Sequence, residues 1–112
     1  MKIWVDDVRP APEGYIWCKS VNQTKNIIEH IEDDVIFDYY VKNLSSKELD
    51  KIELIDIDHD AGEYAKFGGD YIELLNWLEE TGRNYPIHIH SMNPVGIENM
   101  RKIIRRNGWK EV

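Results

Sequence analysis

The chain has 112 residues, which is the size of a single domain and too short for two. We therefore expect one domain over residues 1–112, with enough apolar residues (42%) to form its own core. The 21 acidic and 14 basic side chains give a net charge of -7, which argues against non-specific DNA binding. One cysteine cannot form an internal disulfide, and no apolar run approaches the length that crosses a bilayer. A cytoplasmic protein with no membrane contact is predicted.

The N-terminal part of the chain predicts one strand, then a helix, then a second strand. Residues 2–5 are a β-branched and aromatic run that stops at two aspartates, which is typical of a strand. Residues 9–16 contain two prolines and a glycine and are expected to form an irregular loop. Ser20 and Gln23 have the spacing of a capping box, so a helix is expected to begin there. A second strand is predicted at residues 35–37.

The C-terminal part predicts strands that alternate with amphipathic helices. Residues 44–51 have no decisive pattern, but the apolar residues of 52–57 then alternate with aspartates at the period of a strand. Gly82 and Gly108 suit the left-handed position after a helix, and Asn93, before a proline, suits a helix start. The expected elements are a strand at 52–57, a helix at 70–82, a strand at 87–90, a helix at 93–108 and a strand at 109–112. This alternation predicts an α/β fold with five parallel strands.

Polar residues follow three of the predicted strands, and parallel sheets bind ligands at the carboxyl ends of their strands. Asp6 and Asp7 follow the first strand, and Asp58 follows the strand at 52–57. Hard divalent cations prefer carboxylate oxygens, so these three aspartates are predicted to bind Mg²⁺ or Mn²⁺. The alternative is that each aspartate only caps a turn.

Histidines lie at the same expected edge of the sheet. His90 ends the strand at 87–90, and an ordinary pKa of about 6.5 suits proton transfer near neutrality, so His90 is predicted to be catalytic. His59 lies between two aspartates and is a second catalytic candidate, although a loop histidine bonded to the backbone fits the pattern equally well. His88 shares a strand face with His90 but lies earlier in the strand, where we expect a core position.

The expected helix start near Asn93 is a candidate phosphate site, because unpaired backbone N–H groups at a helix N-terminus attract anions. Gly96 leaves room for a close approach, and Ser91 or Asn93 adds a donor. In the alternative interpretation, Asn93 is only a helix cap and Gly96 a tolerated glycine. Basic residues follow, for which a solvated helix face is a commoner explanation than guidance of a nucleotide or RNA end. They are Arg101, Lys102, Arg105, Arg106 and Lys110.

Three segments together resemble the cyclic-phosphate processing receiver domains, a divergent branch of the response-regulator receiver fold. The segments are VDDVRPAPEG (residues 5–14), IDHDAG (57–62) and IHSMNPVG (89–96) with Asn99 and Met100. The resemblance runs from residue 2 to about residue 104. It implies a single three-layer domain with a doubly wound, five-stranded parallel sheet in receiver or flavodoxin-like order.

The resemblance also implies roles for particular residues. Asp6 and Asp7 would be the metal-binding acidic pair, and Asp58 would stand in the place of the phosphate-accepting aspartate. His59 and His90 would be the histidines that set this branch apart. The residues expected to bind phosphate or substrate are Arg9, Ser91, Asn93 and Gly96. A receiver lysine after the last strand is missing, since Lys110 lies within that expected strand, which argues against phosphorelay signalling.

Residues and resemblance together predict a metal-dependent phosphoesterase that opens a cyclic phosphate on a small cyclic nucleotide or an RNA end. The catalytic set would be Asp58, His59 and His90, with Asp58 acting either as a metal ligand or as the nucleophile. The competing hypothesis is a non-catalytic receiver-like module that sequesters a nucleotide or binds a partner protein. The sequence specifies no oligomeric state.

Overall fold

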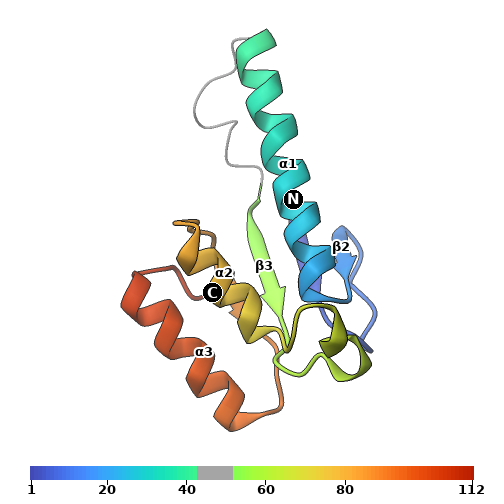
Figure 1. Cartoon of the computed structure of the whole chain (residues 1–112), viewed down its shortest axis with the longest axis vertical. Coiled ribbons are helices and arrows are strands. Elements are labelled where there is room, and N and C mark those ends of the chain that lie inside the picture. Colours follow the sequence, from blue (N-terminus) through green and yellow to red (C-terminus); the bar gives the residue numbers. More distant parts are fainter. Residues whose placement is uncertain (43–51) are drawn as a thin grey trace.

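The computed structural model describes residues 1–42 and 52–112 (Figure 1). Residues 44–51, which have no decisive sequence pattern, lie outside the described residues. The elements, in chain order, are β1 (Lys2–Val5), β2 (Tyr15–Cys18), α1 (Val21–Lys42), β3 (Leu54–Ile57), the 3-10 helix η2 (Gly62–Phe67), α2 (Ile72–Glu80), β4 (Ile87–Ile89) and α3 (Pro94–Asn107).

The strands form one parallel sheet in the order β2-β1-β3-β4. On β1, Val5 lies opposite Cys18 of β2 and Ile57 of β3. On the other side of β3, Ile57 lies opposite Ile89 of β4. Because the strands are parallel and in register, their carboxyl ends lie at one edge of the sheet.

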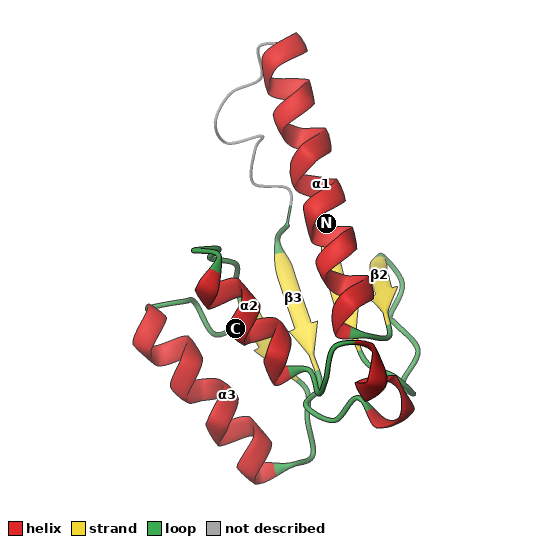
Figure 2. Ribbon diagram, viewed as in Figure 1, coloured by secondary structure: helices red, strands yellow, loops and turns green. Residues whose placement is uncertain are grey.

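The helices α1, α2 and α3 lie on one side of this sheet, in front of it in Figure 2. Alternate strand residues face these helices and are fully buried, as is one side of α2. The core residues include Ile3, Val5, Ile55, Ile57, Ile87, Leu74, Leu75 and Leu78. Within the described part of the chain, no helix has the length and hydropathy needed to cross a bilayer.

The predicted α/β class with a parallel sheet is confirmed, whereas a fifth strand and a third layer are not. Residues 109–112 make one isolated bridge, between Glu111 and Ile87, in place of the expected strand. The helices α1, α2 and α3 cover the same side of the sheet (Figures 1 and 2), so they form one layer against it.

Two predictions about the first half of the chain are wrong. Residues 35–37 belong to α1, because an apolar run of three residues fits a helix as well as a strand. The second strand is instead β2, whose first two residues fall in the segment predicted as a loop. The irregular segment ends at Gly14, which has a φ of +86°, and the β-branched and aromatic residues after it pair with β1.

The predicted capping residues of α1 and α3 are confirmed, whereas α2 is shorter than the expected 70–82 and spans Ile72–Glu80. Ser20 Oγ accepts a hydrogen bond from the Gln23 backbone N–H (3.0 Å), and Gln23 Oε1 accepts one from the Lys19 N–H (2.8 Å). At α3, Asn93 is the N-cap and Gly108, with a φ of +67°, is the C-cap. Side chain and backbone thus satisfy the exposed helix ends as the sequence indicates.

The Ser20 cap generates the first testable prediction. Ser20→Ala removes the acceptor for the Gln23 N–H and is expected to lower the free energy of unfolding by about 1 kcal/mol. Urea unfolding followed by circular dichroism measures this change. Asn26→Ala, at an exposed position of the same helix, is the control and is expected to cause no loss. Equal losses in the two variants would contradict the capping role.

Candidate active site

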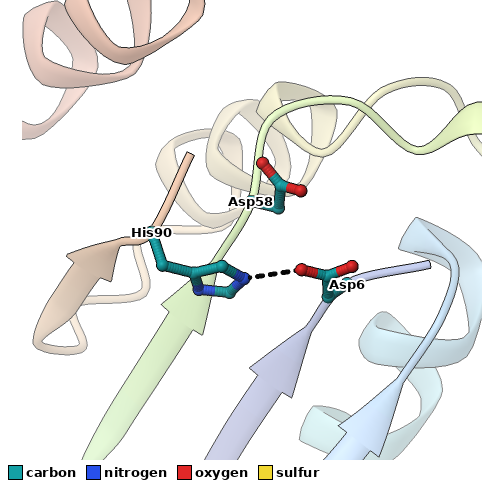
Figure 3. Close-up of side chains that lie close together, drawn as sticks. All are labelled: Asp6, Asp58 and His90. Atoms are coloured by element: carbon teal, nitrogen blue, oxygen red, sulfur yellow. Dashed lines mark hydrogen bonds and ion pairs between the residues drawn. The ribbon is translucent and has the colours of Figure 1, made fainter. Parts of the chain in front are cut away.

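The carboxyl ends of three neighbouring strands bring three predicted residues together (Figure 3). Asp6 follows β1, Asp58 follows β3 and His90 follows β4. One ligand atom from each of these side chains lies within 4.8 Å of the others. We refer to Asp6, Asp58 and His90 as the edge cluster. Their side chains meet as the sequence analysis expects, and their roles stay predictions.

Asp6 is almost completely buried, with 1% of its surface exposed. Its Oδ1 accepts the backbone N–H groups of Val8 and Arg9, both at 2.9 Å. Its Oδ2 lies 2.9 Å from Nε2 of His90. Burial by itself raises the pKa of Asp6, but the two backbone N–H groups and His90 outweigh it and hold the pKa below its usual value. The turn after β1 therefore keeps this carboxylate charged and directed at His90.

His90 is held at both ring nitrogens and on one ring face. Nδ1 lies 2.6 Å from Oδ1 of Asp56, Nε2 faces Asp6, and the Trp4 indole stacks on the ring with centroids 3.9 Å apart. Both partners are carboxylates, which favours the imidazolium form, in which both nitrogens donate. Burial lowers the pKa of His90, but the hydrogen bonds and charges of Asp56 and Asp6 outweigh it and raise the pKa above its usual value.

Asp56 is a site residue that the sequence analysis misses. It is 7% exposed and, in the sheet register, lies between Trp4 of β1 and His88 of β4. Asp56 lies on β3 and Asp58 follows that strand, while His88 lies on β4 and His90 follows that one. The register pairs Asp56 with His88, so its contact with His90 runs diagonally across the two strands, and the sequence alone does not indicate it.

His88 is not in the core, and that prediction is wrong. It is half-buried, and its Nδ1 lies 2.6 Å from the backbone carbonyl oxygen of Val112. The reason is that His88 lies on the sheet face turned away from the described helices, whereas the neighbouring Ile87 faces them and is fully buried.

Asp7 lies beside the edge cluster without belonging to it. Gly62 has a φ of +54°, and a Cβ there would lie 2.5 Å from Oδ2 of Asp7, so only glycine leaves space for this carboxylate. Burial raises the pKa of Asp7, and the charges of Asp6 and Asp58 raise it further. The expected set of three aspartates is thus present as two cluster members, Asp6 and Asp58, with a third carboxylate next to them.

His59 packs against the start of α3 and is not part of the edge cluster. Its Nδ1 lies 2.9 Å from Oδ1 of Asp60, and its backbone N–H donates to Oδ1 of Asp58 at 2.7 Å. A Cβ on Gly96 would lie 2.4 Å from Cγ of His59. The space that we assigned to an approaching phosphate is therefore filled by the His59 ring.

The start of α3 has few backbone N–H groups left for an anion. Ser91 Oγ accepts the Asn93 N–H (3.1 Å), and Asn93 Oδ1 accepts the Gly96 N–H (3.0 Å). Pro94 has no N–H group. The alternative interpretation, in which Asn93 caps the helix, is confirmed, and phosphate binding by Ser91, Asn93 and Gly96 stays a prediction.

Arg9, a predicted phosphate-binding residue, contacts the backbone of the edge cluster. Its Nη1 donates to the His90 carbonyl oxygen at 3.0 Å, and its backbone carbonyl accepts the Trp4 indole N–H at 2.9 Å. The Arg9 side chain is exposed. A guanidinium has five N–H donors, so an anchored Arg9 retains donors for a phosphate.

The basic residues of α3 are largely neutralised by acidic partners. Three of the predicted five form ion pairs within the described residues, which favours the solvated helix face over a nucleic-acid surface. The pairs are Arg101–Glu111, Arg105–Glu98 and Arg106–Glu79. Lys110 lies far from the edge cluster, because its backbone carbonyl accepts the N–H of Ile87 at the opposite end of β4.

The donors at the edge cluster fit a hard divalent cation bound through oxygen atoms. Asp6 and Asp58 supply carboxylates, and Asp7 adds negative charge beside them. The His90 nitrogens point at carboxylates, so His90 is suited to hydrogen bonding and proton transfer rather than to metal coordination.

The fold and the edge cluster define a receiver-like α/β domain with an acidic site at the carboxyl edge of a parallel sheet. The family model of the cyclic-phosphate processing receiver domain matches residues 1–106, and the chain belongs to this family. The resemblance drawn from the three sequence segments is thereby confirmed. A search among curated proteins found no match, and neither did a search among solved structures.

The contact between Gly96 and His59 generates a second prediction. Gly96→Ala places a methyl group on the His59 ring and is expected to lower the free energy of unfolding by about 1–3 kcal/mol. The double variant Gly96→Ala/His59→Ala removes the obstruction and is expected to cost less than the sum of the single variants in urea unfolding. Additive losses would show that the two residues do not press on each other.

The environment of His90 generates a third prediction, on pH. The pKa of His90 is higher in the folded protein than the value of about 6.5 in the unfolded chain, so its charged form stabilises the fold. This contribution is complete below about pH 6.5 and is lost as pH rises through the raised pKa. The stability difference between the wild type and His90→Asn is therefore expected to shrink with rising pH in urea unfolding. A difference that grows with pH would contradict this assignment.

Proposed function

We propose that this domain is a metal-dependent phosphoesterase that opens cyclic phosphates on small cyclic nucleotides or RNA ends. The observation that carries the proposal is His90, with 10% of its side chain exposed, beside the carboxylates of Asp6 and Asp58 in a chain of this family. Phosphoryl transfer needs a group that neutralises oxygen charge and a group that moves a proton, and this edge of the sheet supplies candidates for both.

Asp6 and Asp58 would hold the cation. Bound Mg²⁺ or Mn²⁺ would supply charge neutralisation at the phosphoryl oxygens and lower the pKa of a water molecule. The raised pKa of Asp7 supports this role, because crowding three carboxylates has a free-energy cost that a bound dication relieves.

His90 would act as the general acid. When water attacks phosphorus and the ring-closing P–O bond of the cyclic phosphate breaks, the leaving oxygen takes the proton from Nε2. The attacking water loses a proton to solvent, and the neutral imidazole regains one from solvent. Asp6 favours the charged form of His90 beforehand, because the imidazolium bonds to its Oδ2. Asp58 would assist as a metal ligand or attack phosphorus directly, in which case an acyl phosphate forms and is then hydrolysed.

Arg9 would hold the phosphate. Its guanidinium is exposed and is anchored on the His90 carbonyl, so it lies on the loop next to the proton donor. The ion pairs along α3 leave little positive charge for the body of an RNA, so a short ligand or a chain end suits the site better than duplex nucleic acid.

A non-catalytic binding module is the second candidate function. It is favoured by one observation, that both His90 nitrogens bond to carboxylates and that only 10% of the His90 side chain is exposed. Such a module would retain a cyclic nucleotide without cleaving it, and the ligand would be recovered unchanged.

The proposal predicts hydrolysis of an oligoribonucleotide ending in a 2′,3′-cyclic phosphate, or of a cyclic nucleotide, that requires Mg²⁺ or Mn²⁺ and stops with a chelator. Asp58→Asn removes a charged ligand, and His90→Gln removes the proton donor. Each is expected to reduce kcat by about 10²–10⁴-fold. Product formation resolved by chromatography and phosphorus NMR measures the effect.

Glu98→Gln is the matched control, because Glu98 is an exposed carboxylate on α3 paired with Arg105. It is expected to retain the activity of the wild type. Absence of product from every cyclic phosphate, with either cation, would sink the catalytic proposal. Recovery of unchanged, tightly bound nucleotide would instead support the binding module.

A further inference from the structure

Asp56 is a buried acidic residue to which neither the predicted site nor the proposed mechanism gives a role. It lies on β3 with 7% of its surface exposed, on the sheet face that also carries Trp4 and His88. Its Oδ1 lies 2.6 Å from Nδ1 of His90, closer than the 2.9 Å between Nε2 of His90 and Oδ2 of Asp6. A carboxyl group at such a depth requires a hydrogen-bond partner, and His90 is that partner.

We propose that Asp56 is the positioning residue for His90, fixing the ring so that Nε2 faces the edge cluster. This inference rests on the proposed function, in which Nε2 gives up the proton. Asp56 does not itself meet the substrate, because it contacts the far nitrogen of the ring, on the side away from Asp6.

Stacking on Trp4 cannot perform this task alone. The two rings are 5° from parallel, and a half-turn of the imidazole about its Cβ–Cγ bond leaves its plane, and hence the stacking, unchanged. The same half-turn exchanges Nδ1 with Cδ2 and Nε2 with Cε1, so that carbon atoms would face both carboxylates. Asp56 and Asp6 together distinguish the two orientations, because Asp56 contacts Nδ1 and Asp6 contacts Nε2.

The position of Asp56 within a strand explains why it is suited to this role. A strand residue moves less than a loop residue, and Asp56 lies inside β3, whereas Asp6 lies in the turn after β1. Asp6 would also be occupied by a bound cation in the proposed function. The orientation of His90 would then depend on Asp56.

Asp56→Leu and Asp56→Asn separate positioning from a general structural effect. Leucine fills a similar volume without an acceptor, whereas the asparagine carbonyl oxygen still accepts the Nδ1 proton. In ¹⁵N-histidine-labelled protein, we expect a far-downfield, slowly exchanging His90 Nδ1–H resonance in the wild type and in Asp56→Asn, but not in Asp56→Leu. His90→Gln assigns the resonance. If Asp56→Leu does not fold, Asp56→Ala takes its place.

The kinetic arm uses the cyclic-phosphate substrate. Asp56→Leu is expected to lower kcat by about 10–100-fold with little change in KM, and Asp56→Asn to restore most of the loss. The matched control is Asp60→Leu, because Asp60 bonds to Nδ1 of the other histidine at this edge, His59, and its loss should leave the His90 resonance in place.

Persistence of the Nδ1–H resonance in Asp56→Leu would overturn the positioning role, and so would its loss in Asp56→Asn or in Asp60→Leu. If the wild-type protein cleaves no cyclic phosphate, the proposed function fails. The resonance still decides whether Asp56 orients His90, so the two failures are distinguishable.

Discussion

The parallel register of β1, β3 and β4 is the constraint on which the candidate site depends. The last residues of these strands lie opposite one another, so Asp6, Asp58 and His90, which follow them, reach the same level at one edge. Crowded carboxylates repel, and His90 offsets this repulsion by placing a positive charge between Asp6 and Asp56. Asp58 and Asp7 add further carboxylates beside this pair, and this is why we propose that a divalent cation binds here.

Local patterns in the sequence predict most of the fold. The predictions are wrong where the local pattern is ambiguous. The capping residues Ser20 and Asn93 and the alternation in β3 mark their elements correctly. The run at residues 35–37 continues α1 instead of forming a strand, because three apolar residues cannot distinguish the two. β2 was overlooked because prolines and a glycine precede it, and what establishes it is pairing with β1, which is a non-local contact.

The members of the candidate site can be predicted from the sequence when they directly follow a predicted strand. Asp6, Asp58 and His90 follow strands, and parallel strands bring such residues together. The sequence does not reveal Asp56, because the register pairs it with His88 and its contact with His90 is diagonal across β3 and β4. The role of Gly96 also depended on a distant residue, since the space above it is occupied by the ring of His59.

The central claim is that the edge cluster binds a divalent cation, and paramagnetic NMR with Mn²⁺ tests it most directly. Mn²⁺ broadens the signals of nuclei close to it, so substoichiometric addition should selectively weaken the amide signals of the turns after β1, β3 and β4. Excess Mg²⁺ should restore them. Uniform weakening, or an effect centred on other acidic residues such as Glu79 and Glu98, would contradict the claim.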